Sequence, residues 1–437
     1  MPILNATMGE RSYLLGIFAA VACKTLLIGE AFSLSSFSHP NARFQLNQIK
    51  DHDTFYQRQF QLHQSSNNNN ENPADSIGGD LVTALARLDK QWELSNSVNG
   101  KQNKIGEWTV MDLKEDDSTT PEIVYLLEPA SGAAPSCVIF FLGGAVLGQF
   151  PHISYSTFLK RVAERTNAAV VAIPYEVGLD HFGIAQRAVS RMKSAVVECE
   201  DSRGYPSSLP KYAIGHSLGC KLHSIGVAAT GIGEELAGLG FVSFNNFGFA
   251  DTITMARSFA NEMQLGGNAG FQGVGPAPFD ALFDLASMAI GAVGLEFTPS
   301  PDDLDRIVKT KFNPQNVLKK IRLFKFDNDD LDSSSRFLDC FDNDDSNDMP
   351  SVSNLSGTHL SPVFLKLGVD DLDLPEEARE MADAVTGGFQ NASFGDEELL
   401  DALVDEVSNW MLGKAPSRPS EGSGQKLIAG IIDAEIE

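Results

Sequence analysis

The chain has few basic residues for its size. Its 437 residues include 33 lysines and arginines against 58 aspartates and glutamates, a formal net charge of −25 at pH 7. Such a chain is repelled by nucleic acid and by anionic membrane surfaces. We therefore expect no nucleic-acid partner, and we interpret the acidic stretches 327–348 and 376–437 as solvated surface.

Cysteine is also scarce, with five residues in the whole chain. The count is odd, and the spacing matches neither a disulfide framework nor a metal site. We therefore expect no metal and no cofactor. Cys137 and Cys220 lie in apolar sequence and are interpreted as small buried side chains, which suits a reducing compartment.

The apolar run near the N-terminus, Leu14–Cys23, is too short for a comfortable transmembrane helix. It fits the core of a signal peptide over residues 1–31, because Gly29 and Ala31 supply the small residues of a cleavage site. Residues 32–77 are first Ser-rich and poor in acids and then rich in Asn, as in a transit-like, disordered leader. We expect no stable membrane span in the mature protein.

This two-part leader resembles the plastid leaders of diatoms and related algae. The resemblance implies the chloroplast stroma of an alga with a secondary plastid. A secreted or endomembrane protein is the alternative, since a signal peptide alone would direct either.

Beyond residue 78, apolar runs that predict strands alternate with helical patterns. The predicted strands are Trp108–Leu113, Glu122–Leu127, Ser136–Leu142, Ala168–Ile173, Tyr212–Gly215, Leu239–Phe244 and Ile321–Phe326. The predicted helices are Asp80–Leu94, Tyr155–Thr166, Ile184–Cys199 and Cys220–Ala229. This alternation indicates an α/β fold, with a mostly parallel sheet and helices on both faces.

A segment rich in Gly and Phe, at about 247–320, interrupts the alternation. It contains a predicted helix, Phe279–Val293, and lies between two predicted strands. We interpret it as a helical lid inserted into a domain that spans 78–414. Residues 415–437 are predicted to be a flexible acidic tail.

Ser217 lies in the pattern Gly-x-Ser-x-Gly, formed with Gly215 and Gly219. The pattern follows a predicted strand and opens a predicted helix. A nucleophilic serine on such a turn is lifted clear of the sheet, and the glycines leave room for the strained backbone. The sequence therefore predicts the nucleophile elbow of an α/β-hydrolase fold.

The loop after the predicted strand Ser136–Leu142 begins with Gly143 and Gly144. Glycines let backbone N–H groups approach a tetrahedral intermediate closely. We predict that Gly144 or Ala145 supplies one oxyanion donor. Leu218, at the N-terminus of the helix after the serine, supplies the other.

A catalytic serine needs a base and an acid that orients the base, in the chain order serine, acid, histidine. Of the eight histidines, His359 follows the last predicted core strand and lies in a polar loop with Gly and Pro. The acid is expected just after the strand Ile321–Phe326, where Asp330 is preferred and Asp329 and Asp332 are the alternatives. His181, after an earlier strand, is predicted to line the pocket.

These stretches together resemble an α/β-hydrolase-like family of unknown function found in plants, algae and cyanobacteria. The resemblance covers about Trp108 to Asp370. It includes Phe141–Ala145, Ile173–Tyr175, Asp180–His181, the elbow Gly215–His223 (GHSLGCKLH), Ser243–Asn246, Glu296–Ser300, the Asp327–Asp332 cluster and Gly357–Leu360. The resemblance implies the fold, a plastid or cyanobacterial setting and the triad positions, and it implies no substrate.

The preferred hypothesis is a serine hydrolase acting on a small apolar ester or thioester, such as a lipid-like one. One alternative is a hydrolase-fold protein that no longer catalyses and serves as a binding or assembly factor in the plastid. Another is an acyltransferase on the same fold. The sequence leaves the oligomeric state open.

Overall fold

The computed structural model describes residues 106–113, 122–251, 296–341, 349–367 and 392–416, and part of the stretch 85–93. They all belong to one unit of the chain, 85–114 with 122–437. The predicted leader over 1–77, the predicted helix Phe279–Val293 and nearly all of the tail 415–437 lie outside the described residues.

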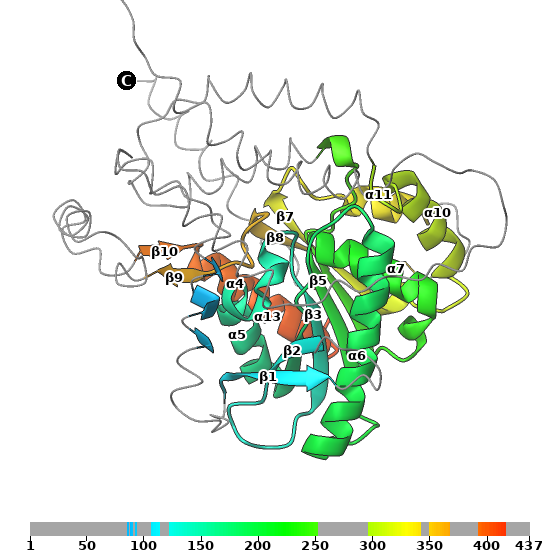
Figure 1. The fold of residues 1–437 in the computed structure, drawn as a ribbon. Coiled ribbons are helices and arrows are strands. Elements are labelled where there is room, and N and C mark those ends of the chain that lie inside the picture. The colour runs from blue at the N-terminus through cyan, green and yellow to red at the C-terminus, as the bar shows by residue number, and fades with distance from the viewer. Residues whose placement is uncertain are drawn as a thin grey trace, which may run out of the picture. The chain divides into compact units, whose positions relative to one another are not determined.

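A sheet of eight strands runs through the molecule in the order β1-β2-β4-β3-β5-β6-β7-β8 (Figure 1). β1 and β2 pair antiparallel, β2 pairs antiparallel with β4, and the pairs from β4 to β8 are parallel. The strands are β1 (Trp108–Leu113), β2 (Glu122–Leu127), β3 (Cys137–Leu142), β4 (Ala168–Ala172), β5 (Lys211–His216), β6 (Gly238–Val242), β7 (Ile321–Asn328) and β8 (Ser351–Thr358). A separate pair joins β9 (Leu365–Leu367) to β10 (Ala392–Phe394).

This strand order, with its antiparallel edge and a serine turn after β5, is that of the α/β-hydrolase fold. The predicted fold class is confirmed. β3, β4 and β6 are buried along their whole length, as expected of parallel strands covered on both faces.

Helices cover the sheet in two groups. α6 packs on α7 and α7 on α10, whereas α5 packs on α13. The first group shares a core with alternate residues of β3 (Val138, Phe140 and Leu142), because side chains along a strand alternate between its faces. The longer helices are α5 (Ser156–Thr166), α6 (His181–Arg203), α7 (Leu218–Thr230), α10 (Pro301–Lys311) and α13 (Glu397–Met411).

Short helices occupy the loops, and none of the helices in the described ranges is both long and apolar enough to cross a bilayer. The short helices are η2 (Leu147–Gln149), α4 (Pro151–Ser154), η3 (Ile232–Glu234), η4 (Phe249–Asp251), η5 (Leu318–Lys320) and α11 (Ser334–Asp339).

The predicted lid differs from the structure at its C-terminal end. Residues 252–295 lie outside the described residues, but 301–320 form α10, η5 and the turns between them. Leu304 and Val308 of α10 are buried in the core against α7. The insertion therefore ends before Pro301, and residues 301–320 belong to the helix layer that covers the sheet.

The acidic stretch 376–437 is not solvated surface throughout. It contains α13, whose Leu400, Leu403, Val404 and Val407 are fully buried. Glu406 of the same helix is also buried, next to Arg322 of β7. The prediction of solvated surface considered only the acidic residues, which lie on one face of this helix, and missed the apolar residues on its other face.

Candidate active site

Ser217 lies at the turn between β5 and α7, with φ 53° and ψ −119°. Few residues other than glycine adopt such a backbone, and strain of this kind gathers at functional sites. A Cβ atom on Gly215 would lie 2.6 Å from the Cys220 nitrogen. The flanking glycine thus makes the tight turn possible, as the sequence pattern predicts.

The Ser217 hydroxyl is in hydrogen-bond contact with His359. Its Oγ lies 2.9 Å from Nε2 of the imidazole. On the other side of the ring, Nδ1 lies 3.0 Å from both carboxylate oxygens of Asp329. An ionised Asp329 accepts the Nδ1 proton, so Nε2 is free to accept the serine proton. The structure therefore brings together a serine, a histidine and an aspartate, in the predicted chain order of serine, acid and histidine.

The carboxylate that contacts His359 belongs to Asp329 and not to Asp330, the preferred residue in the sequence. β7 continues to Asn328, two residues beyond the predicted end, so the acid follows the strand directly. The Asp329 side chain is fully buried against His359, whereas Asp330 is exposed. Asp332, the other alternative, instead accepts hydrogen bonds from the amide and hydroxyl of Ser334 at the start of α11.

Asp329 is held in its ionised form despite its burial. Burial by itself raises the pKa of a carboxyl group. Here the hydrogen bond from His359 and the charge of that ring, together with the hydrogen bond from the Leu331 amide, outweigh burial, and the pKa of Asp329 lies below its usual value. A carboxylate in this state can stabilise the imidazolium that forms when His359 takes a proton.

The two predicted sources of oxyanion donors differ in the structure. Leu218 is the first residue of α7, where a backbone N–H has no partner within the helix. The N–H of Gly144, in contrast, donates to the hydroxyl of Tyr155 at 2.8 Å. Gly144 is therefore wrong as an oxyanion donor because its proton is already bound, and Ala145 is the candidate on that loop.

His181 packs against the end of the insertion. Its ring stacks on Phe297 with centroids 4.2 Å apart and an angle of 22° between the planes. Burial, and then the charge of Lys221, lower the pKa of His181 to about 3, so the ring is neutral near pH 7. The structure places His181 beside Phe297, and its predicted place in a substrate pocket stays a prediction.

The segment Glu296–Ser300 connects the two ends of the insertion through hydrogen bonds. Glu296 Oε1 accepts the N–H groups of Phe249 and Phe297, each at 2.8 Å. Thr298 donates a backbone hydrogen bond to the Leu179 carbonyl, in the loop before α6, and accepts one from the Phe182 amide, in the first turn of α6. This motif therefore ties the end of the insertion to the start of α6, which follows β4.

Lys221 lies next to the segment Glu296–Ser300 and is almost fully buried. Its ammonium group is 3.5 Å from the Phe247 carbonyl oxygen and 5.4 Å from the centre of the Phe297 ring. Burial lowers the pKa of Lys221 to about 8 from its ordinary 10.5. At pH 7 the charge is present in both the folded and the unfolded chain, so the folded state bears the desolvation cost.

We expect Lys221→Met to raise the free energy of unfolding at pH 7, by up to the order of 3 kcal/mol. The wild type gains stability between about pH 8 and 10.5, where the folded chain has lost the proton and the unfolded chain still binds it. The advantage of the variant therefore shrinks over that window. Urea unfolding at pH 7 and at pH 9.5 measures both effects.

Lys160→Met is the matched control, because Lys160 lies in a surface pair with Glu107. Its free energy of unfolding should change by no more than about 0.5 kcal/mol. A Lys221→Met protein less stable than the wild type at pH 7 would show that the buried ammonium is compensated by its surroundings.

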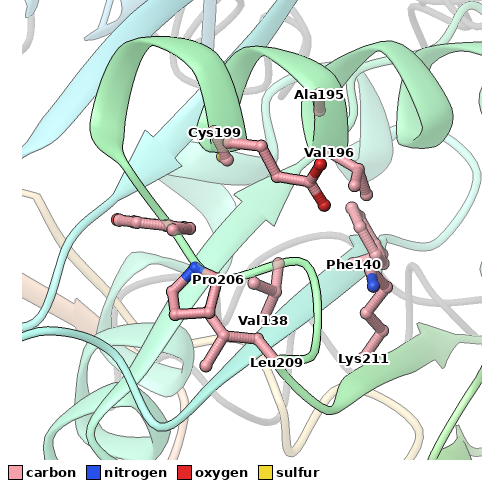
Figure 2. A pocket seen from close by; sticks show the side chains of 10 residues that line it. Val138, Phe140, Ala195, Val196, Cys199, Pro206, Leu209 and Lys211 are labelled. Atoms are coloured by element: carbon pink, nitrogen blue, oxygen red, sulfur yellow. The ribbon is translucent and has the colours of Figure 1, made fainter.

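A small pocket, shown in Figure 2, lies near the amino-terminal ends of the parallel strands, whereas Ser217 lies at their carboxyl-terminal ends. Val138, at the start of β3, and Lys211, at the start of β5, help to line it. Ligands of open α/β sheets bind at the carboxyl ends of the strands, where Ser217 lies, so this pocket is separate from the candidate site. Over the described parts of the chain, no three His, Cys, Asp or Glu side chains are placed to hold a metal ion.

Residues 124–401 match the model of a family described as "Protein of unknown function (DUF1350)". The matched stretch contains Ser217, Asp329 and His359. A comparison with curated proteins returns no match.

Solved structures similar to this chain include several hydrolases. A substrate-bound fluorophosphonate-binding serine hydrolase of Staphylococcus aureus has 12% identity and a TM-score of 0.38, over 58% of this chain and 92% of that one. A soluble variant of monoglyceride lipase from Saccharomyces cerevisiae has 12% identity and a TM-score of 0.38, over 72% and 99%. Est1E of Butyrivibrio proteoclasticus has 13% identity and a TM-score of 0.36, over 70% and 98%. Because these scores are low, the fold assignment rests on the strand order.

Proposed function

Because the chain belongs to the DUF1350 family and places Ser217, His359 and Asp329 in one hydrogen-bonded series, we propose that it is a serine hydrolase of esters or thioesters. The observation that carries the proposal is the 2.9 Å contact between Ser217 Oγ and His359 Nε2, with Asp329 on the far nitrogen. A nucleophile, a base and an orienting group within hydrogen-bond reach form the arrangement that activates a serine.

In the proposed reaction, Ser217 Oγ attacks the carbonyl carbon as its proton passes to His359 Nε2. The backbone N–H groups of Leu218 and Ala145 stabilise the negative oxygen of the tetrahedral intermediate. His359 then returns the proton to the leaving alcohol or thiol, and the acyl group remains on Ser217. Water, activated by the same imidazole, releases the acid and restores the serine.

A fluorophosphonate probe tests the proposal without knowledge of the substrate, because it reacts with activated serines. The wild-type protein should be labelled at Ser217, and Ser217→Ala should abolish labelling. Ser224→Ala is the matched control and should label normally, since the Ser224 hydroxyl is buried in α7 and donates to the Cys220 carbonyl. A folded wild-type protein that is never labelled would contradict catalysis and favour a binding or assembly factor.

A further inference from the structure

His216, the residue before the nucleophile, lies in a buried chain of hydrogen bonds. The Gly144 N–H donates to the Tyr155 hydroxyl at 2.8 Å, and that hydroxyl lies 2.8 Å from Nδ1 of His216. On the other side of the ring, Nε2 of His216 lies 2.9 Å from the backbone carbonyl oxygen of His359. Both Tyr155 and His216 are buried.

The donors and acceptors of this chain determine the tautomer of His216. A carbonyl oxygen can only accept, so Nε2 must carry the proton that faces His359. The pKa of His216 is lowered to about 3, by burial first and then by the neighbouring His359, so the ring holds a single proton near neutral pH. Nδ1 is therefore an acceptor, and the Tyr155 hydroxyl donates to it while accepting from Gly144.

This chain of hydrogen bonds connects three segments that follow or end different strands. Gly144 follows β3, His216 ends β5 next to Ser217, and His359 follows β8. Each loop contributes to the proposed reaction, through the oxyanion donors, the nucleophile and the base. A one-ångström displacement among such groups can cost about 100-fold in rate, so a rigid link between their backbones has a direct catalytic consequence.

We propose that His216, through Tyr155, is a positioning residue that holds the oxyanion loop and the backbone of His359 in register with Ser217. The inference rests on the proposed hydrolase function. His216 neither touches the reacting atoms nor exchanges a proton in the reaction. It supplies a neutral, doubly hydrogen-bonded link that a side chain with one polar atom cannot replace.

Steady-state kinetics of 4-nitrophenyl butyrate hydrolysis test this role. Tyr155→Phe removes one hydroxyl and keeps the ring, and His216→Asn shortens the side chain, which then cannot reach both Tyr155 and the His359 carbonyl oxygen. Each variant should lower kcat on the order of 10- to 100-fold and leave KM within about threefold. The double variant should be no slower than about the slower single variant, because both changes break the same chain.

His223→Asn is the matched control. His223 is also buried, lies on α7, and its Nε2 contacts one backbone carbonyl oxygen, that of Ile214, at 3.2 Å. Its replacement should lower the free energy of unfolding and leave kcat within about twofold. If Tyr155→Phe behaved in the same way, with lower stability and unchanged kcat, the chain would be purely structural and the inference would be overturned.

The tautomer of His216 can be measured independently of activity. In histidine-labelled protein, the ¹⁵N shifts should show Nε2 protonated and Nδ1 unprotonated, with the resonance assigned by its loss in His216→Asn. An Nδ1–H tautomer would overturn the inference even in an active enzyme. The expected tautomer in a protein that hydrolyses no ester or thioester and takes no fluorophosphonate label would overturn the proposed function and, with it, the positioning role.

Discussion

Replacing Asp329 with asparagine is expected to lower kcat about 10⁴-fold with little change in stability. The asparagine amide can donate a hydrogen bond to Nδ1 of His359, which moves the ring proton to Nε2. A protonated Nε2 faces Ser217 Oγ at 2.9 Å and cannot accept its proton. Hydrolysis of a 4-nitrophenyl ester measures the loss, and chemical unfolding checks that the fold is intact.

Asp330→Asn is the matched control for this prediction. Asp330 is the next residue and is exposed, so its variant should keep kcat within about twofold of the wild type. The pair therefore distinguishes the acid that the structure places on His359 from the acid that the sequence favoured. Equal losses in the two variants, or a larger loss in Asp330→Asn, would show that the triad is assigned to the wrong carboxylate.

Gly219→Ala is expected to have the largest effect on stability. Its Cβ would lie 2.0 Å from the Leu142 carbonyl oxygen and 2.7 Å from that of Gly143. Both atoms belong to the backbone at the end of β3, which cannot rotate away as a side chain can. The loss should exceed the range of about 1–3 kcal/mol that is typical of overpacked cores, and the variant is expected to unfold at much lower denaturant.

Gly226→Ala, in the same helix, provides the comparison. There the nearest atom is a methyl carbon of Val189, at 2.7 Å, which a change of side-chain rotamer can move. Alanine is also favoured over glycine inside a helix by about 1 kcal/mol. The two terms oppose each other, so stability should stay within about 1 kcal/mol of the wild type. A Gly219→Ala protein as stable as Gly226→Ala would contradict the close approach of α7 to β3.

The buried strands of the fold could be predicted because they are continuous apolar runs. The predicted bounds of β1 and β2 match the structure, and those of β3 to β6 differ by no more than two residues at either end. α6 begins at His181, earlier than the predicted Ile184, because the Asp180 side chain caps it by accepting the Gly183 N–H. The helix was predicted from the spacing of its apolar residues, and a capping residue does not contribute to that spacing.

Edge elements could not be predicted in the same way. Among the described strands, β8 is at the edge of the sheet and pairs only with β7, and its burial is mixed. Its polar sequence (SVSNLSGT) resembles a loop, and only its partner shows that it is a strand. The sequence did not show where β7 ends either. Because the length of β7 decides which aspartate faces His359, the prediction was one residue too late, at Asp330 instead of Asp329.

The residues themselves determined where the nucleophile turn, the glycine loop and the late histidine occur, because small residues, strained turns and apolar runs have local causes. Only the tertiary structure decided that Asp329 contacts His359 and that the Tyr155 hydroxyl accepts the Gly144 N–H. It also decided that His216 links two loops. These are contacts between residues 11 to 143 positions apart. They follow from how the strands pair, and no local pattern in the chain encodes a distance across the sheet.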